Sequence, residues 1–399
     1  MHPATPIRRT TGRRTRRASS GATALLLSLL LAASTATAQD ADPRQPEAVV
    51  DSRSREIAVA AEDGYVAWHV TTPKYRANVY VRTPDGERFK VNPDGKDAAL
   101  GDIDNGVLVY QEFSGDRFMG ALGKGKSRIR FLDLATRKDV TPSWLDTPGW
   151  EYLPSLSEGQ LFMGRVRGDK RQLIVVDLDT RKQDEIAAVI GRPYWLEPGQ
   201  INHGWVVWTE WDLKHNAVVQ KLNREMGSGG RYASTRASFW APSVDENGVA
   251  YMTKEARRCG TNSRLMREGE VILELPHGDH VARTHVSTGT NGINEVYYTH
   301  DHCNSFDADI YKLRQSLLLK VSTQGDGSVT SLPSGIDCGS TCTAEFPRWG
   351  EITLTAEPGL LSHFVSWTGI CSEYEATCLI SAQNASDLEE ITATFGLGP

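Results

Sequence analysis

The sequence predicts an all-β protein, and three observations lead to that class. Apolar segments of five or six residues recur along the chain, and none is long enough or periodic enough to predict a crossover helix. Valine, tyrosine and tryptophan, which favour strands, dominate these segments, and glycines precede them. Of the 399 residues, 39% are apolar, 24% are charged and 36 are glycine, which excludes disordered and fibrous chains.

The first 38 residues have the pattern of an export signal peptide. Six arginines between Arg8 and Arg17 precede an apolar run over Ala24–Ala33, and Ala36-Thr37-Ala38 is a small-x-small cleavage site. The apolar run is too short to cross a bilayer, and no later segment reaches about 18 uncharged residues. We therefore expect a mature chain that starts near Gln39, has no transmembrane helix, and is secreted or held at the cell surface.

The charge of the chain argues against nucleic acid as a partner. The signal segment holds six basic and no acidic residues, so the rest of the chain carries a net charge of −12 against −6 for the whole. Binding to phosphates requires a surplus of Lys and Arg on one face. We expect a partner of another class.

A repeat organises residues 56–315, after a short lead-in over residues 39–55. In each repeat a glycine precedes a β-rich strand, and a polar loop, a second strand and a short third strand follow. The leading strands begin at residues 65, 107, 161, 205, 249 and 295, in steps of 42 to 54 residues. Repeats of this length built only of strands are typical of β-propeller blades, so the sequence predicts six blades.

This repeat rhythm resembles the six-bladed, TolB-like propellers of secreted bacterial proteins. The resemblance covers roughly residues 50–315 and implies an architecture rather than an activity. The innermost strand of a blade is expected just before each leading glycine, for example over Ala98–Ile103, Glu151–Leu156 and Phe239–Val244.

Six cysteines lie beyond the signal segment, and an even number in an oxidising compartment predicts three disulfides. Cys259 and Cys303 occupy equivalent positions in blades five and six, so a bridge between them would fasten the two blades. Cys338 with Cys342 and Cys371 with Cys378 each flank one turn, which favours local bridges. A zinc site of four thiolates is the alternative, but these spacings are wider than those of paired zinc knuckles.

Residues 317–399 have a different sequence pattern from the repeats. A glycine turn at Gly325-Asp326-Gly327, Cys338-Gly339, the run Leu354–Pro358, Phe364–Trp367 and the closing Thr392–Phe395 follow one another in order. This run resembles the divergent internalin-type B-repeat, which implies a small β-grasp-like module that serves as a contact or spacer domain. A domain of this size buries little surface alone, so the two local disulfides would stabilise it.

A cluster of histidines is the one candidate metal site. His300 and His302 stand two residues apart on a predicted strand and therefore point to the same side. Asp279, Asp301, Asp307 and Asp309 are candidate oxygen ligands. The alternative is that these residues are polar loop residues beside a disulfide.

Aromatic residues are dense in blades three to five. Flat aromatic faces bind sugar rings or peptide side chains, and the ends of propeller channels are common ligand sites. Some of these residues must pack between blades instead. The candidates for ligand contact are Trp150, Trp195, Trp211 and Trp240.

These observations predict an exported, extracytoplasmic binding protein whose propeller takes a glycan, a peptide or a protein, without a cofactor. No common hydrolase motif occurs in the chain. The alternative is a propeller enzyme, a metal-assisted polysaccharide lyase or hydrolase that uses the His/Asp cluster of blade six. Convergent titratable groups in the channel would favour the enzyme.

Overall fold

The computed structural model describes residues 45–52, 54–72, 76–114, 126–145, 150–191, 195–212, 216–256, 260–289, 292–303, 305, 307–339, 341–371, 375–382 and 384–398. The predicted signal segment, residues 1–38, and Cys259 lie outside these residues. Apart from one short 3-10 turn at Ser143–Leu145, every element described is a β-strand, so the all-β prediction is confirmed. In the described part of the chain, no helix has the length and apolar character needed to cross a membrane.

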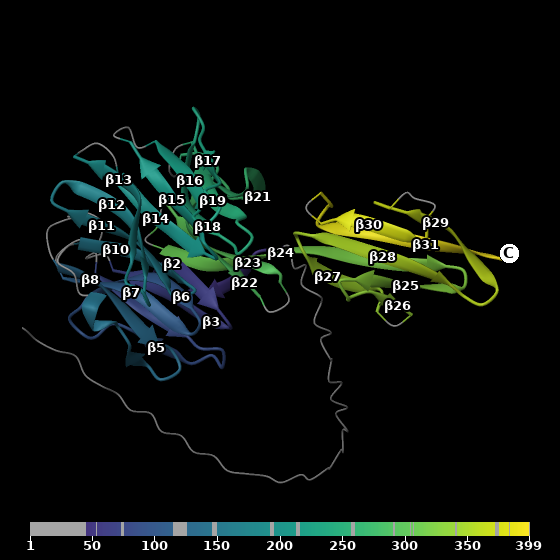
Figure 1. The fold of residues 1–399 in the computed structure, drawn as a ribbon, viewed down its shortest axis with the longest axis horizontal. Helices are drawn as coiled ribbons and strands as arrows, with labels where there is room; N and C mark the ends of the chain where they lie inside the picture. The colour runs from purple at the N-terminus through teal and green to yellow at the C-terminus, as the bar shows by residue number, and fades with distance from the viewer. Residues whose placement is uncertain are drawn as a thin grey trace, which may run out of the picture. The chain divides into compact units, whose positions relative to one another are not determined.

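Four separate antiparallel sheets of four strands each follow one another over residues 97–274, and each keeps its strands in chain order (Figure 1). The strands are β6 (Asp97–Asp104), β7 (Val107–Ser114), β8 (Lys126–Asp133) and β9 (Lys138–Asp139); β10 (Trp150–Ser157), β11 (Gln160–Arg167), β12 (Lys170–Asp177) and β13 (Gln183–Ile190); β14 (Trp195–Asn202), β15 (Trp205–Trp211), β16 (Ala217–Asn223) and β17 (Gly229–Tyr232); and β18 (Ser238–Val244), β19 (Ala250–Glu255), β20 (Arg264–Arg267) and β21 (Glu270–Glu274).

A larger sheet joins strands from the beginning and the end of the repeat region, in the order β22-β23-β24-β2-β3-β4-β5. One parallel register pair, Arg55 with Ala308, connects β2 to β24. The strands are β2 (Arg55–Glu62), β3 (Tyr65–Thr71), β4 (Ala77–Arg82), β5 (Arg88–Lys90), β22 (Asp279–Thr288), β23 (Asn294–His302) and β24 (Asp307–Gln324).

The first strands of these strand groups contact one another in a closed succession. β2 contacts β6, β6 contacts β10, β10 contacts β14, β14 contacts β18, β18 contacts β22, and β22 contacts β2. Four-stranded sheets whose first strands surround a common axis form a β-propeller. The segments predicted as innermost strands are confirmed as parts of β6, β10 and β18. Because β2–β5 and β22–β24 are hydrogen-bonded into one sheet, the count of six blades stays a prediction.

The lead-in contains a strand that the sequence pattern did not reveal. β1 (Glu47–Val50) pairs antiparallel with β24, and Val50 lies opposite Ile310. Val49 and Val50 are buried and pack with Ile310 and Trp68. Pairing of this N-terminal strand with β24 adds backbone hydrogen bonds and apolar burial where the beginning and the end of the repeat region meet.

The C-terminal residues form two further groups of strands around one core. One sheet has the order β26-β25-β28-β30. In the other group, β27 and β31 pair with the second half of β24, and β29 pairs with β31. Both groups contribute to a single buried core that includes Leu319, Leu354, Trp367 and Phe395. The strands are β25 (Gly327–Leu332), β26 (Asp337–Cys338), β27 (Thr343–Pro347), β28 (Glu351–Pro358), β29 (Ser362–Thr368), β30 (Thr377–Ser381) and β31 (Leu388–Leu397).

Strand β24 passes through the predicted boundary between the repeats and the C-terminal module. The first half of β24 pairs with β23 as far as Gln315. The second half pairs with β27 from Ser316 onward and with β31 from Leu318 onward. The change in sequence pattern at residue 317 therefore corresponds to a change of pairing partners within one strand, and not to a loop between two domains.

Two of the three predicted disulfides are confirmed. Cys338 bonds to Cys342, and Cys371 bonds to Cys378. Cys303 is also disulfide-bonded. Its predicted partner, Cys259, lies outside the described residues, so that pairing stays a prediction.

Candidate ligand-binding channel

A bulge interrupts the first strand of each four-stranded group and of β22. The register with the second strand shifts after Ile57, Leu100, Tyr152, Pro198, Trp240 and Val281. Ala58, Leu153 and Ala241 have positive φ at these bulges, and Pro154 and Pro242 follow two of them. A bulge places consecutive residues on the same side of a strand, so each of these strands turns two or three neighbouring residues toward the axis.

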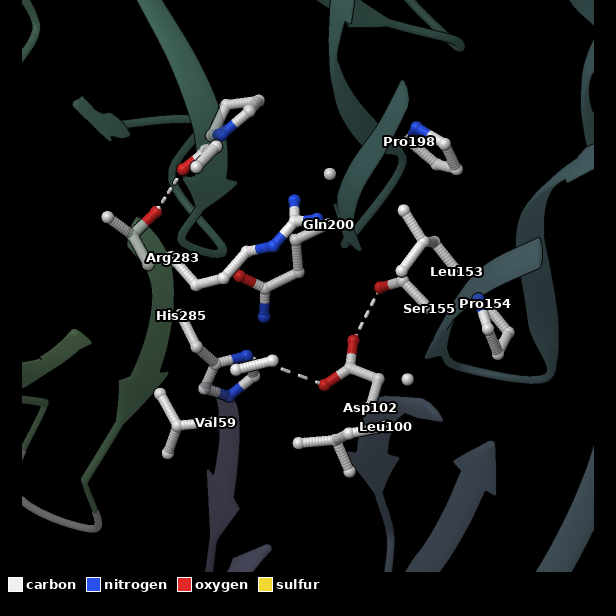
Figure 2. A pocket seen from close by; sticks show the side chains of 16 residues that line it. Val59, Leu100, Asp102, Leu153, Pro154, Ser155, Pro198, Gln200, Arg283 and His285 are labelled. Carbon is white, nitrogen blue, oxygen red and sulfur yellow. Dashed lines mark hydrogen bonds and ion pairs between the residues drawn. The ribbon is translucent and has the colours of Figure 1, made fainter. Parts of the chain in front are cut away.

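These residues line a small cavity of about 70 Å³. β2, β6, β10, β14, β18 and β22 each contribute adjacent residues to the lining, as Figure 2 shows for most of them. Small or apolar residues such as Leu100, Pro198 and Ala241 form much of the wall. Among the lining residues, Asp102, Arg283 and His285 carry ionisable groups, and they determine the chemistry of this channel.

Asp102 and His285 form a buried polar group on one side of the cavity. Figure 2 shows the Asp102 carboxyl between Ser155, whose hydroxyl donates to it, and the His285 ring. His285 Nδ1 lies 3.6 Å from Asp102 Oδ1, and its Nε2 lies 3.3 Å from the carbonyl oxygen of Ala61. The Ser155 hydroxyl also accepts from the Ile201 amide at 2.9 Å. The hydroxyl of Ser155 is therefore satisfied by a carboxyl and an amide.

Burial shifts both titratable groups toward their neutral forms. Desolvation raises the pKa of Asp102 to about 7, although the hydrogen bond from Ser155 opposes the shift. Desolvation lowers the pKa of His285 to about 4. Between about pH 4 and 7 the two side chains together therefore hold one proton, and the pair has no net charge.

Gln200 and His285 also line a second cavity of about 190 Å³. The Gln200 amide donates to the Val286 carbonyl at 3.1 Å, from one side of the ring to another. Glu62, Asp104 and Glu246 line this second cavity, which is acidic for that reason. The two cavities therefore differ in electrostatic character.

Arg283 and Glu197 form an ion pair at the first cavity. Arg283 Nη1 donates to Glu197 Oε1, and the Trp211 indole donates to Glu197 Oε2 at 3.0 Å. The Glu197 side chain is 4% exposed, and that of Arg283 is 18% exposed. Both carboxylate oxygens of Glu197 are engaged, while the guanidinium of Arg283 faces the cavity that it lines.

Trp211 bonds to this ion pair, and Trp240 packs against Trp211. Their ring centroids are 5.9 Å apart and the planes are inclined by 57°. His280 stacks on Trp240 with a centroid distance of 4.8 Å, and its Nδ1 lies 2.7 Å from Glu255 Oε2. His280 and Glu255 are buried, whereas both indoles are partly exposed. The structure thus brings two of the four predicted tryptophans together, on a rigid polar support.

The other two predicted tryptophans occupy different environments. Trp150 is 6% exposed and packs with Phe113 in a core cluster, so its ring is a packing element rather than a surface. Trp195 stacks on Tyr152 at 5.3 Å, and the Arg171 guanidinium lies over its ring. We therefore leave Trp150 and Trp195 out of the candidate site.

The structure places His300 and His302 next to Asp279, one of the four aspartates considered from the sequence. His300 Nε2 lies 3.1 Å from Asp279 Oδ2, and His302 Nδ1 lies 3.1 Å from Asp279 Oδ1. Asp301 instead pairs with Arg55 at 2.8 Å. Asp309 Oδ2 is 3.9 Å from His302 Nε2.

Arg283, Glu197 and the Asp102 group were not predicted from the sequence. Glu197 and Arg283 are 86 residues apart, and their contact arises from the ring rather than from any local pattern. One local signal was available: Pro154 and Pro242 interrupt segments that otherwise read as inner strands. Proline within a strand indicates a bulge, and bulges cluster near functional sites.

No known protein family matches the chain, and no curated protein resembles it significantly. Among solved structures, TolB from Acinetobacter baumannii is 14% identical with a TM-score of 0.42, over 63% of this chain and 63% of that one. The chain thus spans less than two thirds of that protein.

Putative TolB from Agrobacterium tumefaciens is 12% identical with a TM-score of 0.40, over 66% of this chain and 91% of that one. The β-propeller domain of the Trilobed protease from Pyrococcus furiosus is 11% identical with a TM-score of 0.38, over 66% of this chain and 96% of that one. TolB-like propellers are therefore among the structures to which this chain is similar.

Proposed function

We propose that this chain is an exported, extracytoplasmic binding protein that takes a neutral glycan beside Trp211 and Trp240. The disulfides and the predicted signal segment support the compartment, because disulfides persist in oxidising surroundings. The propeller supplies a rigid frame for the site, since the contributing side chains stand on strands rather than on loops.

The observation that carries the proposal is that two partly exposed indoles, Trp211 and Trp240, pack together and that Trp211 bonds to an ion pair whose charges cancel. A pyranose ring offers an apolar face that packs on an indole, together with hydroxyls that both donate and accept. Arg283 and Glu197 together carry no net charge, so this end of the channel has no electrostatic preference for a charged ligand. These features favour a neutral sugar over a charged peptide.

The polar groups of the channel support a binding role more than a catalytic one. Ser155 donates to Asp102 rather than to an imidazole, so Asp102, Ser155 and His285 lack the serine-to-histidine contact of a nucleophilic triad. The alternative, a metal-assisted polysaccharide lyase or hydrolase, is favoured by one observation, the grouping of Asp279, His300 and His302.

We also propose that residues 317–399 act as a contact or spacer module of the internalin B-repeat type, attached to a six-bladed propeller over residues 56–315. Exposed apolar side chains at Leu360, Leu361 and Leu397 support a contact role. The Gly398 amide donates to the Leu361 carbonyl at 3.1 Å, which brings two of these segments together.

The binding proposal is tested by replacing Trp240. A panel of immobilised neutral oligosaccharides, acidic oligosaccharides and peptides identifies the tightest ligand of the tag-free mature protein, and calorimetry then measures its Kd. For Trp240→Ala we expect the Kd to rise about tenfold to a hundredfold, because anchoring aromatics contribute about 1–3 kcal/mol.

The matched control is Trp205→Ala. Trp205 begins β15, at the opposite end of that strand from Trp211, so the control removes an indole outside the Trp211–Trp240 pair. The control should leave the Kd unchanged. Equal losses in both variants, or binding of peptides alone, would contradict a glycan site at Trp240.

A further inference from the structure

We propose that Asp279, His300 and His302 form a binding site for a divalent transition metal ion, with Zn²⁺ as the best fit. The inference is independent of the glycan site, because none of these three residues takes part in that site. Within the described residues, these three side chains form the one group in which at least three metal-ligating atoms lie within 4.8 Å of one another.

Strand pairing explains why the three side chains meet. Asp279 of β22 lies directly opposite His302 of β23, and His300 is two residues before His302. Residues two apart on a strand share a face, and directly opposed residues in neighbouring strands share it too. The backbone ladder therefore sets the positions of all three ligand groups before any ion binds.

The distances between the donor atoms suit a small tetrahedral ion. Zn–N and Zn–O bonds of about 2.0–2.2 Å at tetrahedral angles separate neighbouring ligand atoms by about 3.3–3.6 Å. His300 Nε2 and His302 Nδ1 each lie 3.1 Å from a different oxygen of Asp279. One ligand atom from each of the three residues lies within 4.8 Å of the other two, so the side chains would have to adjust slightly to reach tetrahedral spacing. Two imidazoles and one carboxylate are a donor set that zinc accepts, whereas Ca²⁺ and Mg²⁺ prefer oxygen ligands.

Hydrogen bonds from the histidines to Asp279 are the competing explanation for the cluster. His300 Nε2 is buried and faces the Asp279 carboxylate at 3.1 Å. In this position the ring nitrogen can donate to the carboxylate or, without its proton, bind a metal ion through its lone pair. The convergence of three ligand groups, rather than two, distinguishes the cluster from an ordinary surface pair.

The surroundings combine rigidity with access. The side chains of His300, Asp279 and His302 are 15%, 23% and 36% exposed, so the cluster lies near the surface although His300 Nε2 itself is buried. Next to His302, Cys303 is disulfide-bonded, and its amide donates to the Gly278 carbonyl at 3.1 Å. The start of β22 and the end of β23, where the three ligand residues stand, are thereby held together.

Asp309 places a second carboxyl group near the cluster. Its Oδ2 lies 3.9 Å from His302 Nε2, the ring nitrogen that does not face Asp279, which is too far for a direct hydrogen bond. The proposed site thus has three ligands, with the Asp309 carboxyl nearby.

The test uses tag-free mature protein that has been treated with a chelator and then titrated with ZnCl₂ in a calorimeter. We expect one equivalent to bind to the wild type, and the Kd to rise at least about a hundredfold in His300→Ala and in Asp279→Asn, because loss of a ligand should exceed the 10–100-fold effect of losing an outer partner. Titration with Co²⁺ should also give the visible absorption of a tetrahedral site in the wild type.

The control is His203→Ala, which removes an exposed histidine whose Nε2 lies 3.4 Å from Glu158 Oε1. This variant should bind Zn²⁺ as the wild type does. Asp279→Asn keeps the shape of the side chain, and equal thermal unfolding temperatures show that the fold is intact. No zinc binding by the wild type, or equal binding by Asp279→Asn and the wild type, would overturn the site while leaving the glycan proposal untouched.

Discussion

Replacing Glu151 by alanine should destabilise the propeller by about 3–5 kcal/mol. Glu151 of β10 lies directly opposite Arg165 of β11, and their side chains are 1% and 3% exposed. Arg165 Nη2 and Nε donate to Glu151 Oε1 at 2.6 and 2.9 Å. Without Glu151 the buried Arg165 guanidinium would lose the carboxylate charge that balances its own. Gln183 also accepts from Arg165 Nη1 at 2.9 Å, but its amide carries no charge.

The matched control for this experiment is Glu185→Ala in the same sheet. Glu185 pairs with Lys170 at 2.8 Å, but the two side chains are 43% and 38% exposed. Exposed pairs contribute less than about 1 kcal/mol, because water and salt screen them. Urea unfolding of both variants measures the difference. A loss below about 1 kcal/mol for Glu151→Ala would show that the Arg165 charge reaches water.

Asp102→Asn should change how stability depends on pH, and it should be the more stable protein at pH 8. Burial raises the pKa of Asp102 to about 7 from an unfolded value of 3.8. The folded state therefore keeps a proton that the unfolded state has lost, so wild-type stability falls as the pH rises from about 4 to 7. Asparagine resembles the protonated acid and removes this loss, which amounts to at most about 4 kcal/mol.

Two features make the comparison specific. His285 acts in the opposite direction, since its lowered pKa of about 4 costs stability as the pH falls below 6.5, and it is present in both proteins. As a control, Asp133→Asn replaces an exposed carboxyl whose pKa is lowered by hydrogen bonds from Thr136. That variant should instead lose stability relative to the wild type as the pH rises. Parallel pH curves for Asp102→Asn and the wild type would contradict a protonated Asp102.

The sequence patterns predicted features that depend on local periodicity. The position just before each leading glycine located the inner strands β6, β10 and β18, and short spacings identified Cys338–Cys342 and Cys371–Cys378. A two-residue spacing placed His300 and His302 on one face. In each case, the neighbours that matter lie within one strand or one turn.

Features that depend on the closed ring could not be predicted in this way. β1 pairs with a strand about 260 residues away, and its four residues carry no pattern distinct from the lead-in. Trp150 and Trp240 both lie near the start of a first strand, yet one is buried by Phe113 and the other is partly exposed beside Trp211. The neighbouring strands decide the environment of each side chain. The density of aromatic residues in the sequence therefore overestimates the number of tryptophans that can contact a ligand.

The most direct test of the proposed binding site is a crystal structure of the mature protein with the tightest-binding neutral oligosaccharide from the panel. We expect electron density for a sugar ring against Trp211 or Trp240, with hydroxyls in hydrogen-bonding reach of Arg283. Density at the acidic cavity beside Glu62 and Asp104, or on the C-terminal strands alone, would contradict the account.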